Sequence, residues 1–146
     1  MLEPVIRAGQ TYTLPRDLQR DVALRFWFAP EHEVFVALDG GHALGTYFLR
    51  ANQHGGGAHV ANCGYITASD AEHRGVGRAM CAHSLEQART RGFRAMQFNF
   101  VVSTNERAVQ LWQRFGFEIV GRLPHAFCHP QRGYVDAYVM YLQLDR

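Results

Sequence analysis

The chain contains no lysine: all 15 of its basic residues are arginines, set against 13 acidic residues in a total of 146. The resulting formal net charge of +2 is too small to create the strong positive field of a nucleic-acid-binding protein. We attribute the missing lysine to GC-rich codon usage. We expect no nucleic-acid partner, and a small nucleic-acid-associated protein stays only as a third alternative.

Cysteines are few, and long apolar runs are missing. Cys63, Cys81 and Cys128 are odd in number and widely spaced, which argues against a disulfide framework and a CxxC metal site. We therefore expect no metal and a reducing, cytoplasmic location. No stretch approaches about 18 consecutive apolar residues, so we expect no membrane partner. The start of the chain shows no signal peptide.

The composition that is present, 47% hydrophobic and 19% charged, is typical of a globular protein. The length predicts a single domain over residues 1–146. Apolar periodicity predicts a helix ending near Pro30, two helices over 75–92 and 105–116, and strands over 33–38, 43–49, 58–67, 93–102, 117–123 and 134–144. This order predicts a mixed α/β (α+β) fold with one main sheet.

The segment after the third expected strand has the features of a phosphate-binding turn. Gly75 and Gly77 lack a Cβ, so a ligand can approach their backbone, and Arg74 and Arg78 flank them. The first N–H groups of a helix, together with its dipole, favour a phosphate or pyrophosphate there. No GK[ST] follows, which excludes a P-loop, and Met80 stands where a Rossmann turn needs its third glycine.

Two motifs in this order resemble the GNAT superfamily of acetyl-CoA-dependent N-acetyltransferases. The first is the window Glu72-His73-Arg74-Gly75-Val76-Gly77, and the second runs from Asn105 to Phe117, with Trp112 in the place of the family tyrosine. The resemblance implies a mostly antiparallel sheet of about six strands, flanked by helices and opened by a V-shaped cofactor cleft. It further implies acetyl-CoA as co-substrate.

The resemblance assigns cofactor contacts residue by residue. The pantetheine arm would pair with backbone near Ile66 and Thr67. The pyrophosphate would lie on the N–H groups of Arg74, Gly75, Val76, Gly77 and Arg78. Further cofactor contacts would come from Asn105, Ala108 and Trp112.

The resemblance also implies catalytic roles, which serve proton transfer and charge stabilisation. It implies that a β-bulge near Gly64 and Tyr65 directs a backbone N–H toward the acetyl carbonyl as an oxyanion donor. In the family, the tyrosine of the second motif protonates the leaving thiolate, but an indole N–H is a far weaker acid. In this chain we therefore expect the thiolate to depart with solvent help or to be stabilised by Tyr138 or Asn99. Trp112 itself is also expected as a core residue of its helix.

The acceptor is expected to be a small amine. Asn99 interrupts an apolar strand, and comparable asparagines occur in small-amine members of the superfamily. The last segment, LPHAFCHPQRGYVDAYVMY, is expected to form a loop and a strand that cap the acceptor pocket. Its candidate substrate-binding residues are His125, His129, Tyr134 and Asp136.

Judged against the family, a first strand and most of a first helix are expected to be absent, with residues 3–9 as the tail of that helix. The strand over 33–38 would then have an unpaired edge, which a homodimer partner would cover. The resulting hypothesis is direct acetyl transfer to a primary or secondary amine of a small molecule, such as an amino acid. Alternatives are a peptide or protein N-acetyltransferase and a catalytically silent acyl-CoA-binding module.

Overall fold

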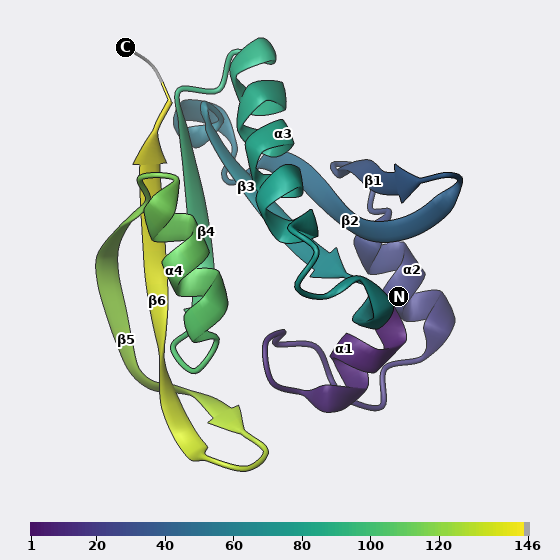
Figure 1. Ribbon diagram of the computed structural model, residues 1–146. Coiled ribbons are helices and arrows are strands. Elements are labelled where there is room, and N and C mark those ends of the chain that lie inside the picture. The colour runs from purple at the N-terminus through teal and green to yellow at the C-terminus, as the bar shows by residue number, and fades with distance from the viewer. Residues whose placement is uncertain (145–146) are drawn as a thin grey trace.

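The computed structural model describes residues 1–144, and these form a six-stranded sheet with helices on both faces (Figure 1). The strands are β1 (Glu33–Asp39), β2 (His42–Ala51), β3 (Val60–Thr67), β4 (Ala95–Val102), β5 (Glu118–His129) and β6 (Gly133–Gln143). Their order in the sheet is β1-β2-β3-β4-β6-β5. Every neighbouring pair is antiparallel except β3 and β4. The expected mixed fold with a mostly antiparallel sheet is confirmed.

The four helices divide between the two faces of this sheet. They are α1 (Leu2–Ala8), α2 (Arg20–Trp27), α3 (Val76–Thr90) and α4 (Glu106–Arg114), with short 3-10 turns at Gly55–Gly57 and Ser69–Ala71. Tyr47 points to the face covered by α3 and α4, whereas the next residue, Phe48, packs against Trp27 of α2 on the other face. This alternation is the two-residue period of a strand buried on both sides.

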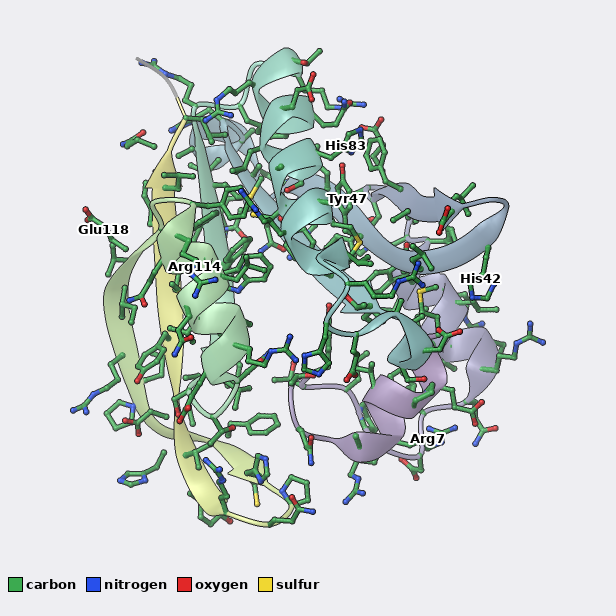
Figure 2. All side chains as sticks on the ribbon, viewed as in Figure 1. Arg7, His42, Tyr47, His83, Arg114 and Glu118 are labelled. Atoms are coloured by element: carbon green, nitrogen blue, oxygen red, sulfur yellow. The ribbon has the colours of Figure 1, made fainter. Side chains whose placement is uncertain are left out.

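Helix α3 lies against β2 at a glycine. A Cβ on Gly45 would lie 2.9 Å from side-chain atoms of both Met80 and Val76, so the small residue lets the helix approach the strand. Figure 2 shows Tyr47 of β2 and His83 of α3 directed toward one another, and the Tyr47 hydroxyl lies 2.7 Å from His83 Nδ1. Burial is the main cause that raises the pKa of Tyr47 above its ordinary value.

The central parallel pair explains the V shape. β3 and β4 pair only at Val60 with Ala95 and at Ala61 with Met96. Beyond these positions the strands do not pair, and β4 continues against β6 instead. We call the unpaired part, residues 62–67 of β3 facing residues 97–102 of β4, the splay. It is the expected V-shaped opening.

The expected bulge at Gly64 and Tyr65 is wrong. β2 and β3 pair without a register shift from Gly45 opposite Thr67 to Ala51 opposite Ala61. Gly64 instead leaves room for Phe48, its cross-strand neighbour on β2. A Cβ at position 64 would lie only 2.5 Å from Phe48 Cε1. The irregularity of the splay lies on the other strand, where the β4–β6 register shifts between Phe98 and Val101.

The segment after Leu123 also differs from the expectation of a loop. β5 continues through it to His129, with a register shift between Leu123 and Phe127 and a positive φ of 53° at His125. The last two strands therefore form one long hairpin. At the other edge of the sheet, β1 has β2 as its only strand partner within residues 1–144.

Candidate active site

The backbone of β3 presents alternate residues to the splay. Asn52 N donates to Val60 O, and Ala68 N donates to Leu44 O, at the two ends of the β2–β3 ladder. Because hydrogen-bonded pairs alternate in an antiparallel ladder, the residues between them that bond to β2 are even-numbered. Cys63, Tyr65 and Thr67 therefore turn their N–H and C=O groups toward β4.

This alternation divides the two residues expected to pair with pantetheine. Thr67 turns its backbone toward the splay, where it can pair with a bound ligand. Ile66 instead bonds through its backbone to β2 and buries its side chain beside Trp27 and Phe48. Tyr65 takes the place of Ile66 at the open edge, although its carbonyl already accepts a 2.9 Å hydrogen bond from the Tyr12 hydroxyl.

The residues expected to form a phosphate turn lie at the N-terminus of α3. Gly75 is its N-cap, with a left-handed φ of 77° that glycine adopts without strain, and no side chain caps the helix. The N–H groups of Val76, Gly77 and Arg78 have no acceptor within the helix, since the first four N–H groups of a helix are unpaired there. A Cβ on Gly77 would lie 3.5 Å from Leu111 Cδ2, so this turn faces α4.

The two arginines beside the turn lie at the surface. Arg74 NH2 lies 3.3 Å from Asp39 Oδ2, and both side chains are exposed. Arg78 is exposed on the first turn of α3. Neither side chain is buried in the turn, so an anion bound there would be contacted mainly by backbone N–H groups.

The expected cofactor contacts Asn105, Ala108 and Trp112 belong to helix α4 and its N-cap. Asn105 is the N-cap of α4, but its side chain makes no capping hydrogen bond. Ala108 is half-buried against the main core. Trp112 is 8% exposed, and its ring lies 4.9 Å from that of Tyr65 and 5.0 Å from that of Phe98. The expectation that Trp112 packs in the core is confirmed.

The Tyr65 side chain points to the face covered by α3, where its hydroxyl forms a hydrogen bond with a residue of that helix. Its hydroxyl donates to Ser84 Oγ at 2.7 Å, and Ser84 donates in turn to the Cys81 carbonyl at 2.8 Å. Burial raises the pKa of Tyr65 well above its ordinary value. Any contribution of Tyr65 to the chemistry is therefore made by its backbone N–H.

The buried cysteines next to this group are held as neutral thiols. Cys63 and Cys81 are 8% and 0% exposed, as expected for residues that take no part in the chemistry. Burial raises the pKa of both thiols from 9.0 to about 12. Since the thiolate is the nucleophile, neither cysteine is activated at neutral pH.

Asn99 lies in a chain of amide side chains on the other face of the sheet. Its Oδ1 accepts from Gln97 Nε2 at 2.9 Å, and its Nδ2 donates to Asn52 Oδ1 at 2.7 Å. The polar interruption of an apolar strand therefore has both partners within the protein, at the register shift of β4.

Tyr138 and the candidates from the last segment lie elsewhere. Tyr138 lines a surface hollow of about 300 Å³ between α4 and the β5–β6 hairpin, together with Ser103, Glu106 and Gln110 among others. Tyr134 is 71% exposed near the tip of the hairpin. Tyr138 pairs with Val101 of β4, so its backbone lies one strand away from the open edge of β3, whereas Tyr134 lies far along the hairpin.

His129 and Asp136 stabilise the hairpin itself. His129 is 8% exposed, and its Nδ1 accepts from the N–H groups of Gln131 and Arg132, both at 3.2 Å. Asp136 Oδ1 accepts from His125 N at 2.9 Å, and its Oδ2 lies 3.5 Å from Arg122 NH1. The hairpin tip reaches the N-terminal segment, where Gln10 Nε2 lies 3.4 Å from Gln131 Oε1.

The sequence analysis missed two groups near the splay. Tyr12 bonds to the Tyr65 carbonyl from the segment between α1 and α2, and burial raises its pKa above the ordinary value. Arg50 lies beside Asn62 on the face opposite α3. Within residues 1–144 no group of three or more His, Cys, Asp or Glu side chains is arranged so that it could hold a metal ion. No helix in that range is long and apolar enough to cross a membrane.

Comparison with known proteins connects this geometry to a family. The model of the acetyltransferase (GNAT) family matches residues 4–117. The N-acetyltransferase aca1 of Schizosaccharomyces pombe is 30% identical over 151 residues, which cover 92% of this chain and 72% of that protein.

Solved structures agree with this match. A GCN5-related N-acetyltransferase from Kribbella flavida superposes with a TM-score of 0.92 at 41% identity, covering 97% of this chain and 87% of the other. The yncA protein of Salmonella typhimurium, whose structure contains its cofactor acetyl-CoA, has the same fold with a TM-score of 0.85 at 19% identity, over 99% and 85% of the two chains. The chain belongs to the GNAT family and is an acetyl-CoA-dependent N-acetyltransferase of that type.

Proposed function

We propose that this protein transfers the acetyl group of acetyl-CoA directly to a primary or secondary amine of a small molecule, an amino acid or an amino-acid-like compound. The observation that carries the proposal is the position of the splay next to the N-terminus of α3. An extended cofactor bound by its pyrophosphate at Gly75 to Arg78 can reach the open edge of β3 without leaving the protein surface.

The residues present fit this cofactor. The uncapped N–H groups of α3 suit a pyrophosphate, and the backbone of Thr67 suits the amide groups of pantetheine. The uncommitted side chain of Asn105 adds an amide at the N-terminus of α4. When bound, acetyl-CoA supplies the activated acetyl group.

Direct transfer needs no nucleophile from the protein, which agrees with the neutral state of the buried thiols of Cys63 and Cys81. The Tyr65 N–H faces the splay from a regular strand and is suited to donate to the acetyl oxygen. Trp112 lies against the Tyr65 ring, and we assign its indole N–H a cofactor contact.

The positions of the helices determine from which face of the sheet the acceptor amine can approach. α3 and α4 cover one face of the sheet, and the phosphate turn of α3 faces α4. An acceptor that meets the acetyl group through the splay therefore approaches from the opposite face, where Asn62 and Asn99 lie.

Calorimetric titration with acetyl-CoA tests the cofactor site. We expect micromolar binding by the wild-type protein. Gly77→Val places a branched side chain over the phosphate turn, and we expect at least about tenfold weaker binding. Ala79→Val, an exposed site on the same helix, is the matched control and is expected to bind as wild type does.

Turnover tests the reaction itself. Release of CoA thiol in the presence of a panel of amino acids and simple amines is expected for at least one small amine. Acetylation of peptide N-termini alone would replace the small-molecule proposal with a peptide substrate. Tight binding without turnover of any amine would indicate a silent acyl-CoA-binding module.

A further inference from the structure

A chain of hydrogen bonds crosses the sheet face opposite α3 and α4. Arg50 Nε donates to Asn62 Oδ1 at 3.2 Å, and Asn62 Nδ2 donates to the Gln97 carbonyl at 2.9 Å. The Gln97 side chain donates to Asn99, and Asn99 donates to Asn52. The amides of Asn62 and Asn99 each accept one of these bonds and donate another, and the Gln97 backbone carbonyl joins the two halves, so the five residues hold one another in place.

This chain lies where β3 and β4 separate. Asn62 follows Ala61, the last β3 residue that pairs with β4, and its cross-strand neighbour on β2 is Arg50. Gln97 likewise follows Met96, the last β4 residue that pairs with β3. The hydrogen-bonded residues therefore lie at the narrow end of the splay, on the face from which the acceptor is proposed to approach.

Arg50 is the one cation among these hydrogen-bonded residues, and within residues 1–144 its charge has no counter-ion. The only hydrogen bond that its side chain makes with residues 1–144 uses Nε, and none of the ion pairs in that range includes it. The side chain is half-buried. The bond to Asn62 fixes the guanidinium group, and both terminal nitrogens are left to donate.

A fixed, half-buried guanidinium with two unused terminal nitrogens matches a carboxylate, which accepts two parallel hydrogen bonds in one plane. Asn62 is 8% exposed, and both its amide atoms are already used within the protein. Asn62 is therefore a positioning residue for Arg50.

We propose that Arg50 binds the carboxylate of the acceptor, so that the acceptor is an amino acid and not a simple amine. This inference rests on the proposed function, because it takes the acceptor amine to react at the neighbouring splay. It identifies the acceptor by a charged group that the reaction itself does not need.

The test compares each amino acid with the amine that lacks only its carboxylate: proline with pyrrolidine, leucine with isopentylamine, and phenylalanine with phenethylamine. For wild-type protein we expect turnover of the acid of at least one pair to exceed that of its amine. Arg50→Gln is expected to raise KM for the acid about 10- to 100-fold, the effect of losing charge-assisted hydrogen bonds. Turnover of the matching amine and binding of acetyl-CoA should stay unchanged.

Two further variants separate binding from folding. Arg50→Lys keeps the charge but loses the planar pair of donors, so we expect an intermediate KM. Arg89→Gln removes an exposed arginine of α3 and is expected to behave as wild type. Equal loss of activity toward acid and amine in Arg50→Gln would show a structural role and overturn the proposal. Equal wild-type activity toward acid and amine would overturn it too, while the N-acetyltransferase proposal would stand.

A binding measurement keeps the two proposals distinguishable if no amine is turned over. The N-acetyl derivatives of the same three amino acids and three amines are titrated into the CoA complex, with the Arg50 Nε–H resonance as the reporter. Support for the carboxylate site would need two results. The Arg50 Nε–H resonance would shift with the N-acetyl amino acids but not with the N-acetyl amines, and Arg50→Gln would lose calorimetric binding of the N-acetyl amino acids. Both results can be obtained even if the proposed reaction fails. No shift with any acid would overturn the carboxylate site.

Discussion

At the scale of single residues, Gly64 shows how the absence of a side chain makes room for a large neighbour. Phe48 crosses directly above it, and the Phe48 ring stacks on His32 and meets the edge of Trp27. The aromatic group therefore occupies the volume that a side chain at position 64 would need.

We expect Gly64→Ala to lower the free energy of unfolding by about 1–3 kcal/mol, the usual cost of overpacking a core. Chemical denaturation measures the change. Gly56→Ala is the matched control, since a Cβ there meets nothing within 4 Å. Adding Phe48→Leu to Gly64→Ala should recover part of the loss, and an unchanged loss would contradict the steric explanation.

At the scale of elements, the β5–β6 hairpin is stabilised by the residues that the sequence offered as substrate ligands. Asp136 accepts from the backbone of His125, at the irregular part of β5 where φ is positive. His129 accepts the N–H groups of the turn that joins the strands. These contacts explain the polar side chains of this segment without a ligand.

We expect Asp136→Ala to lower the free energy of unfolding by about 1–3 kcal/mol, because the His125 N–H loses its acceptor. Asp136→Asn keeps an acceptor oxygen, so it should cost less and leave kcat nearly unchanged. Denaturation and steady-state kinetics measure both variants. A loss of kcat of about a hundredfold in the stable Asp136→Asn variant would instead make Asp136 a proton acceptor in the reaction.

At the scale of the whole molecule, the core between the sheet and α3 determines how the protein responds to alkali. Cys63 and Cys81 both lie in this core, and burial raises their pKa from 9.0 to about 12. Above pH 9 the unfolded chain loses these protons while the folded chain keeps them. Stability is therefore fully present below pH 9 and falls as the pH rises toward about 12.

Each thiol should lower the free energy of unfolding by up to about 1.4 kcal/mol per pH unit in this window. Denaturation midpoints from pH 7 to 10.5 measure the slope. Cys81→Ala removes one of the two groups, and we expect a shallower alkaline slope for this variant. An identical slope would assign the alkaline loss to other groups, such as the buried tyrosines.

The pairing of the strands is also decided at this scale. β1 lies at the edge of the sheet within residues 1–144, with Val36 and Leu38 exposed along it. A homodimer that covers this edge stays a proposal, and analytical ultracentrifugation of the wild-type protein tests it.

The sequence by itself determined the local elements and the glycine-bearing start of α3, where a phosphate turn is proposed. Gly75, Val76 and Gly77 follow a strand and open a helix, and every one of these features is encoded by neighbours in the chain. The six strands and the three longer helices were predicted for the same reason, because apolar periodicity is a local signal. The α1 helix was recognised as a helical tail.

The tertiary structure alone decided which side chains meet. Arg50, Asn62 and Asn99 come from three strands, and only the sheet register brings them into one chain of hydrogen bonds. Gly64 was read as a bulge because the sequence does not show that Phe48 lies across from it. Contacts between distant segments depend on register and on sheet order. A pattern along one strand specifies which residues share a face, but not which partners they find across it.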